Sequence, residues 1–271
     1  MMSSRQRPWC ALTIAGSDSG GGAGIQADLK TFAAHGVHGL SAIAALTAQN
    51  TRGVSAVHVP PASFLRAQID ACFEDFRIGA VKIGMLANAR VIHAVGDALE
   101  TWRPLHVVLD PVMVASSGAR LLEPAALSAL RSRLIPLASL LTPNIPEAEL
   151  LLGHAIPDAD GAEAALVELL ALGSPAVLLK GGHMKGKTLV DRLDDGRQRH
   201  EFVHPRLALH GHGTGCTLAA AIAARLCLGS TLAQACAEAA DYVHGALLAG
   251  YAPGKGRLRV LDHFWRMAKS D

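Results

Sequence analysis

The sequence predicts an α/β fold of three layers, with helices covering both faces of a mostly parallel β-sheet. Short apolar runs of strand length alternate with longer amphipathic segments along most of the 271 residues, which is typical of repeated strand–helix–strand units. Half of the residues are hydrophobic, so a chain of this length can bury a large core. No repeat or linker interrupts the pattern. We expect one domain over residues 9–271, preceded by a disordered segment over residues 1–8.

Strands are predicted where short, mainly apolar runs lie between turn-forming residues. These runs cover residues 9–15, 40–46, 54–59, 80–84, 106–110, 139–142 and 176–180. Helices are predicted for the longer segments 23–35, 62–76, 90–101, 124–134, 146–152, 161–172, 218–228 and 231–248. Residues 188–204 alternate polar and apolar side chains around Asp194-Asp-Gly196, which predicts a β-hairpin.

Polar residues or glycines follow most of the predicted strands. Ligands of open α/β sheets bind at the carboxyl ends of the strands, so these residues predict a site at that edge. The segments are Gly16–Ser19, Thr47–Asn50, Gly84–Met85, Asp110–Val112, Thr142–Asn144 and Lys180–His183.

The segment His210–Thr217 has glycine at three alternate positions, and the Ala-rich helix 218–228 follows it. A glycine-rich turn that opens a helix presents unpaired N–H groups at the positive end of the helix dipole, which favours binding of a phosphate. Cys216 lies in the first turn, where this field is expected to lower its thiol pKa. The alternative is an ordinary turn followed by a buried helix with a core cysteine.

Three charged residues near the carboxyl edge of the predicted sheet, Asp110, Glu147 and Lys180, suit a magnesium–nucleotide complex. Asp110 can bind Mg²⁺ directly or through water, or it is a turn aspartate. Asn144 and Glu147 have the spacing of a helix capping box, which also places Glu147 near the sheet edge. Lys180 can neutralise the charge of a phosphate, or it is a lysine at a strand end whose aliphatic part is buried and whose ammonium group lies in solvent. Together with the glycine turn, these residues predict phosphoryl transfer from a Mg–nucleotide.

Two further glycine motifs are not taken as nucleotide sites. Gly181–Thr188 fits the phosphate-loop pattern, but the residues that follow predict a strand rather than the required helix. Gly22–Ala27 fits a dinucleotide fingerprint, but Gln49 stands at the end of the second predicted strand, where that fingerprint needs an acid.

Composition argues against several other classes of protein. The net charge of +2 gives no reason to expect nucleic-acid or membrane binding, and no apolar run reaches the length of about 18 residues needed to span a membrane. The N-terminus does not resemble a signal peptide. The five scattered cysteines suit a reducing compartment. We therefore expect a cytoplasmic protein with a small-molecule substrate.

Taken together, these motifs resemble the hydroxymethylpyrimidine/phosphomethylpyrimidine kinase family, the thiamine-biosynthesis branch of the ribokinase-like superfamily. The resemblance runs from about residue 10 to 265 and implies a ribokinase-like αβα sandwich. It also implies two successive ATP-dependent phosphorylations, of 4-amino-5-hydroxymethyl-2-methylpyrimidine to its monophosphate and then to the diphosphate. The segments that carry the resemblance are Ala15–Lys30, Thr47–Thr51, Lys82–Leu86, Asp110–Val114, Thr142–Glu147, Lys180–His183 and Gly213–Cys216.

The resemblance also implies a role for each site residue. Cys216 would be the base that accepts the proton of the substrate CH₂OH, and Gly213, Thr214 and Gly215 would form the anion hole. Asp28 and Gln49 would hydrogen-bond the aminopyrimidine, with Gly16, Met85 and Val112 lining the ring pocket. Asp110 and Glu147 would organise Mg²⁺. ATP would contact Lys180, Asn144 and Thr214.

Three other functions remain open at this point. A pyridoxal kinase of the same superfamily phosphorylates a similar ring, although Gln49 and Met85 favour the pyrimidine. A non-catalytic pyrimidine sensor is less consistent with the presence of Cys216, Lys180 and both acids. A sugar kinase is disfavoured by the cysteine in the base position. The sheet edge between residues 38 and 60 makes a homodimer an expectation.

Overall fold

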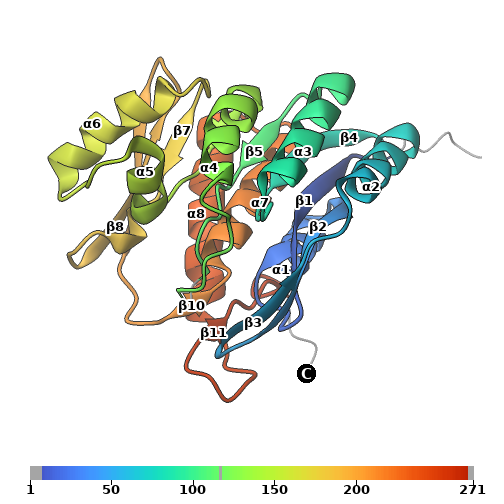
Figure 1. Cartoon of the computed structure of the whole chain (residues 1–271). Coiled ribbons are helices and arrows are strands. Elements are labelled where there is room, and N and C mark those ends of the chain that lie inside the picture. The colour runs from blue at the N-terminus through green and yellow to red at the C-terminus, as the bar shows by residue number, and fades with distance from the viewer. Residues whose placement is uncertain (1–7, 116–117, 268–271) are drawn as a thin grey trace, which may run out of the picture.

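A nine-stranded sheet forms the centre of the computed structural model, which describes residues 8–115 and 118–267 (Figure 1). The strand order is β3-β2-β1-β4-β5-β6-β7-β8-β9. All neighbours from β2 to β7 in this order run parallel, and β3, β8 and β9 are antiparallel to their neighbours. The strands are β1 (Cys10–Asp18), β2 (His38–Asn50), β3 (Gly53–His58), β4 (Ile78–Ile83), β5 (Val107–Leu109), β6 (Leu140–Leu141), β7 (Val177–Leu179), β8 (Thr188–Asp194) and β9 (Arg199–Pro205).

Helices cover both faces of this sheet, so the predicted three layers and mostly parallel sheet are confirmed. One face packs against α1 (Gly24–Ala34), α7 (Thr214–Cys227) and α8 (Leu232–Leu248). The other packs against α2 (Ala62–Asp75), α3 (Ala89–Trp102), α4 (Ala126–Ala129), α5 (Ile145–Leu152) and α6 (Ala159–Leu170). Residues of β1 alternate between the two cores: Leu12 faces the second helix layer and Ala11 the first.

Helix α7 is the element that joins the core to the site. Its Ala-rich run from Leu218 to Ala224 is buried on all sides, because small side chains let α1, α8 and the sheet all approach it closely. The helix begins at Thr214, directly after Gly213. Packing therefore fixes the position of the helix N-terminus relative to the strand ends.

Several elements differ from the sequence-based expectation: β1 continues to Asp18 rather than ending at residue 15, and α7 begins at Thr214 rather than at residue 218. The predicted helix 124–134 is α-helical only over Ala126–Ala129 and continues as a π-helical turn, Leu130–Leu134, and a 3₁₀ turn, Ile135–Leu137. Pro136 lies in this last turn and cannot supply a helical N–H. Strand β2 continues to Asn50, past the predicted end at residue 46, because it pairs with β3.

The predicted hairpin is confirmed as β8 and β9, which run antiparallel. The C-terminal tail adds a short parallel pair that the sequence did not predict, β10 (Gly211–His212) with β11 (Arg259–Val260). Gly256 N–H in this tail donates to Thr51 Oγ1 in the β2–β3 turn at 3.0 Å. The tail therefore contacts both the β2–β3 turn and the strand that leads into α7.

The expectations for domain organisation remain predictions. The N-terminal segment 1–8 lies outside the described residues except for Pro8, and one domain over residues 9–271 stays a prediction. No helix in the described part of the chain is long and apolar enough to cross a membrane.

Candidate active site

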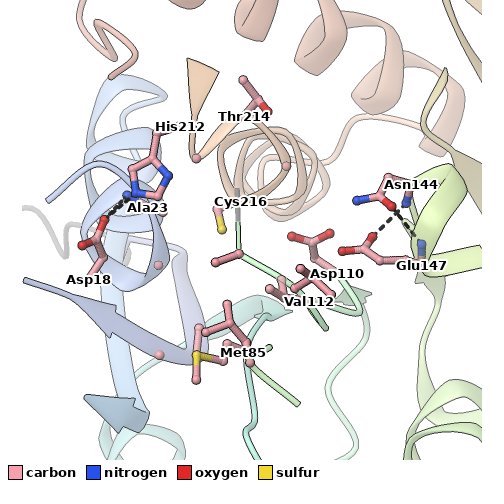
Figure 2. Close-up of a pocket in the computed structure, with 18 of the residues that line it drawn as sticks. Asp18, Ala23, Met85, Asp110, Val112, Asn144, Glu147, His212, Thr214 and Cys216 are labelled. Carbon is pink, nitrogen blue, oxygen red and sulfur yellow. Dashed lines mark hydrogen bonds and ion pairs between the residues drawn. The ribbon is translucent and has the colours of Figure 1, made fainter. Parts of the chain in front are cut away.

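A cavity of about 390 Å³ lies at the carboxyl ends of the parallel strands. Figure 2 shows Asp18 and His212 on one side of it, Asn144 and Glu147 on the opposite side, and Cys216 and Asp110 between them. The structure brings all but one of the predicted site residues to this cavity, and the exception is Asp28. The residues brought together are Gly16, Gln49, Met85, Asp110, Val112, Asn144, Glu147, Lys180, Gly213, Thr214, Gly215 and Cys216.

The start of α7 lines the cavity. Gly213 is the N-cap residue with φ of 85°, and a Cβ there would lie 2.0 Å from Gly22 O, so only glycine fits. A Cβ on Gly215 would lie 3.2 Å from Lys180 Nζ. The N–H groups of the first helical turn have no acceptor within the helix. They face the cavity next to a lysine, which suits a phosphate group.

The pKa of Cys216 differs from the expectation. Burial raises the pKa of this thiol to about 11, and the nearby carboxylates of Asp28 and Asp110 add to the rise. Lys82 and the Gly24 N–H act in the opposite direction but do not compensate. The expected lowering of the thiol pKa is therefore wrong, because desolvation outweighs the field of the helix end.

Lys180, Asp110 and Glu147 form a charged group at the other wall. Lys180 Nζ lies 2.7 Å from Asp110 Oδ1 and 3.7 Å from Glu147 Oε2. Burial alone would lower the pKa of Lys180, but the two carboxylates raise it above its ordinary value, so the lysine is charged. Burial, together with the charge of Asp110, raises the pKa of Glu147 to about 7 despite the opposing effect of Lys180.

The structure confirms the capping box predicted for Asn144 and Glu147, and the role of Glu147 at the site stays a prediction. Asn144 Oδ1 accepts from Glu147 N at 2.9 Å, and Glu147 Oε2 accepts from Asn144 N at 2.8 Å, which completes the capping box of α5. The same geometry places both side chains at the cavity (Figure 2). Capping thus holds Glu147 in position beside Lys180 rather than excluding a functional role.

The carboxylates at this wall fit a magnesium ion that is bound together with phosphates. Asp110 Oδ1 and Glu147 Oε2 take part in the bonds described above, which leaves Oδ2 and Oε1 for a ligand. In the described part of the chain, no three His, Cys, Asp or Glu side chains gather into a metal cluster. Mg²⁺ at nucleotide sites keeps several waters and uses one or two carboxylates, so this pair is sufficient.

Part of the cavity lining is apolar. Met85 and Val112 supply apolar side chains. The thioether of Met85 can pack against the backbone of Gly16 because this residue has no Cβ, which would lie 2.9 Å from Met85 Sδ. Gln49 also lines the cavity, and its amide lies 3.2 Å from His212 Nε2. An apolar slot with one amide suits a flat ring whose edge carries hydrogen-bonding groups.

Asp28 does not line the cavity. Its side chain is fully buried, 2.8 Å from Lys82 Nζ and 2.7 Å from Thr13 Oγ1. It lies on the inward face of α1 together with Ile25, Thr31 and Phe32. Lys82, which does line the cavity, is its charge partner. The structure therefore places Asp28 behind the cavity wall, and a direct contact with substrate stays a prediction that this position does not favour.

Sequence reasoning assigned no role to Asp18 or His212. His212 Nε2 lies 2.9 Å from Asp18 Oδ2 (Figure 2), and Asp18 also accepts from the backbone N–H groups of Gly20, Gly22 and Ala23. The pair joins the first glycine turn to β10, the short strand that leads into α7. The aspartate at the end of β1 and the histidine before Gly213 were visible signals, but 194 positions separate them.

Comparison with known proteins decides the family. Residues 18–261 match the family model described as phosphomethylpyrimidine kinase. The chain belongs to this family. The hydroxymethylpyrimidine/phosphomethylpyrimidine kinase of Rhizobium meliloti is 47% identical over 262 residues, which cover 94% of this chain and 98% of the relative.

Two other similarities widen the comparison. The thiamine biosynthesis bifunctional protein ThiED of Geobacter sulfurreducens is 51% identical over 246 residues, which are 90% of this chain but only 50% of that protein. The chain therefore spans half the length of that relative. A crystal structure of an ADP complex of Bacillus subtilis pyridoxal kinase superposes with a TM-score of 0.89 at 32% identity, covering 96% of this chain and 100% of that one. This phosphomethylpyrimidine kinase family member therefore shares the ribokinase-like fold.

Proposed function

We propose that this phosphomethylpyrimidine kinase family member phosphorylates 4-amino-5-hydroxymethyl-2-methylpyrimidine with ATP, first to the monophosphate and then to the diphosphate, in thiamine biosynthesis. The observation that carries the proposal is that one cavity is lined by two kinds of group. Met85, Val112 and Gln49 suit an aminopyrimidine, and Gly213–Gly215 with Lys180 suit phosphate. Cys216 lies at the same cavity (Figure 2).

At the phosphate end, catalysis rests on positioning and on neutralising charge. The N–H groups of the first turn of α7 face the oxygens of the transferring phosphoryl group, and Lys180 supplies a fixed positive charge. We propose that Asp110 and Glu147 hold Mg²⁺ through the carboxylate oxygens that Lys180 and Asn144 leave free. When bound, Mg²⁺ offsets the negative charge of the phosphates.

Cys216 is proposed to accept the proton of the substrate hydroxyl. Because its pKa is raised to about 11, it is mostly a neutral thiol at neutral pH, and only the thiolate can act as the base. The positive charge of Lys82 and the Gly24 N–H both favour that thiolate. This role predicts an activity that rises with pH.

Pyridoxal phosphorylation is the second candidate, since the fold superposes closely on a pyridoxal kinase. The side chain that favours the pyrimidine is Gln49. An amide offers one donor and one acceptor side by side, which complements the paired amino group and ring nitrogen of an aminopyrimidine. A sensor without catalysis would not need the Lys180–Asp110–Glu147 group, and a sugar would not need the apolar slot beside Met85.

The test is ATP consumption with mass analysis of the products, with hydroxymethylpyrimidine and pyridoxal offered in parallel in the presence of Mg²⁺. We expect the pyrimidine to become mono- and then diphosphorylated. Turnover of pyridoxal alone would contradict the proposed substrate but not the kinase chemistry. Binding of the pyrimidine without turnover of either compound would favour the sensor.

We also propose that the protein is a homodimer and that it is cytoplasmic. The β2–β3 hairpin forms an edge of the sheet (Figure 1), and it exposes Leu46 by 41% and Val57 by 43%. Exposed apolar side chains next to a free strand edge suit pairing with a second copy. Light scattering on the purified protein tests the dimer, and a monomer at micromolar concentration would contradict it.

A further inference from the structure

Asp18 can only accept hydrogen bonds. Its Oδ1 accepts from Gly20 N at 2.8 Å, and its Oδ2 accepts from Gly22 N at 3.1 Å and Ala23 N at 2.9 Å. Burial alone would raise the pKa of Asp18, but the bonds from His212 and from these backbone groups lower it. The carboxylate is therefore ionised at neutral pH, and it has no proton to give.

This fixes the proton on His212. Its Nε2 lies 2.9 Å from Asp18 Oδ2, and a bare lone pair at that distance from a carboxylate oxygen would be repelled. Nε2 must therefore carry a hydrogen and donate it. His212 is buried at the wall of the cavity, where this contact with Asp18 holds its ring.

The orientation of the Gln49 amide follows from this proton. In the structure the amide nitrogen lies 3.2 Å from His212 Nε2, and Oε1 lies 3.1 Å from Thr47 Oγ1. In that arrangement the Gln49 amide N–H and the His212 Nε2–H, which are both donors, face each other. The same arrangement also asks Thr47 to donate its single hydrogen twice, since Thr47 Oγ1 already donates to Ser17 O at 2.9 Å.

A half-turn of the amide is possible because its two ends have nearly the same shape, and it removes the contact between two donors. His212 Nε2–H then lies between two acceptors, Asp18 Oδ2 at 2.9 Å and Gln49 Oε1 at 3.2 Å, and shares its hydrogen between them. The amide N–H donates to Thr47 Oγ1, which keeps its own hydrogen for Ser17 O. Each end of the amide retains one free position, an acceptor on the His212 side and a donor on the Thr47 side.

We propose that His212, oriented by Asp18, is a specificity-determining positioning residue that fixes the donor–acceptor order of Gln49 toward the ligand. The inference rests on the proposed function for the identity of the ligand. It requires a ring edge with a donor on the His212 side and an acceptor on the Thr47 side. A 4-aminopyrimidine has such an edge in its amino group and N3, whereas the 4-oxo analogue carries the reverse order, a carbonyl oxygen and an N3–H.

The first test is the ratio of the affinities for these two compounds, measured by calorimetry without nucleotide. We expect the wild-type protein to prefer the 4-amino compound by about 10- to 100-fold, because a mismatched buried hydrogen-bonding group is unfavourable. In His212→Leu the amide is free to turn, and the ratio should fall to about 3-fold or less. In His212→Gln an N–H can again reach both Asp18 and Gln49, and the preference should return.

A purely structural role for His212 gives a different result. His212→Leu would then lower the affinity for both compounds by the same factor and leave the ratio of the two affinities unchanged. That result would overturn the inference. Restoration of affinity in His212→Gln without restoration of the ratio would also overturn it.

A second measurement does not depend on the ligand. Long-range ¹H–¹⁵N correlation spectra of the free wild-type protein, assigned with the His212→Gln variant, report which ring nitrogen of His212 bears hydrogen. We expect hydrogen on Nε2, and hydrogen on Nδ1 alone would overturn the inference. If the wild-type protein binds neither pyrimidine, the proposed function fails, and this spectrum still decides the orientation of the amide.

Discussion

The buried pair between Asp28 and Lys82 distinguishes a structural role for Asp28 from the substrate contact that the resemblance implied. Both side chains are 0% exposed, and their charged atoms lie 2.8 Å apart. In Asp28→Asn, Thr13 Oγ1 keeps a hydrogen-bond acceptor, but the Lys82 ammonium loses its counter-charge. The substitution therefore tests the charge pair with little change in side-chain volume.

The expected loss of stability is large. Removing one partner of a buried ion pair costs about 3–5 kcal/mol, because the remaining charge stays desolvated. A change of 1 kcal/mol moves the Tm of a domain of this size by about 2 °C, so Asp28→Asn should lower the Tm by about 6–10 °C. The double variant Asp28→Asn/Lys82→Met removes both charges and should recover most of this loss.

The assay combines thermal unfolding followed by circular dichroism with calorimetric binding of hydroxymethylpyrimidine. We expect the affinity of Asp28→Asn for the pyrimidine to stay within about 3-fold of wild type at 20 °C, because Asp28 does not line the cavity. A variant with unchanged Tm and an affinity lowered by more than about 10-fold would refute the reasoning and make Asp28 a ligand contact.

Three further predictions concern the cavity. Cys216→Ser should lower kcat by about 100-fold or more while substrate affinity stays within about 3-fold. Wild-type kcat should rise between pH 7 and 9, because the thiolate fraction grows toward a pKa of about 11; a pH-independent kcat, or a fully active serine variant, would contradict the base role. Gly213→Ala places a Cβ 2.0 Å from Gly22 O at a φ of 85° and should abolish phosphoryl transfer. The matched control is Gly229→Ala, where φ is 92° and a Cβ would meet no atom within 4 Å. This control carries only backbone strain of about 1–2 kcal/mol and should stay active. Finally, the folded-state pKa of Glu147 is raised to about 7, so the folded protein binds more protons than the unfolded chain at mildly acid pH. The unfolding free energy of the magnesium-free protein should therefore fall by up to about 3 kcal/mol from pH 5 to pH 8. Glu147→Gln should flatten this pH dependence in urea titrations, and an unchanged dependence in the variant would contradict the prediction.

The sequence by itself determined the layers, the order of the elements and the edge of the sheet that carries the site. These follow from local patterns: apolar runs of strand length, the turn around Asp194-Asp-Gly196, and the capping spacing of Asn144 and Glu147. The glycines before α7 belong to the same class, because Gly213 adopts a backbone conformation that other residues rarely take. Such signals lie within a few positions of the structure they predict.

Only the tertiary structure decided which side chains meet and how much water remains around them. The capping spacing could not show that Glu147 lies 3.7 Å from Lys180. The inward position of Asp28 depends on how α1 packs, and its partner Lys82 lies 54 positions away. The pKa of Cys216 was predicted with the wrong sign because a helix end is a local feature, whereas desolvation is a property of the whole cavity. The bond between Asp18 and His212 joins residues 194 positions apart for the same reason, since long-range packing, not sequence spacing, brings the two side chains together.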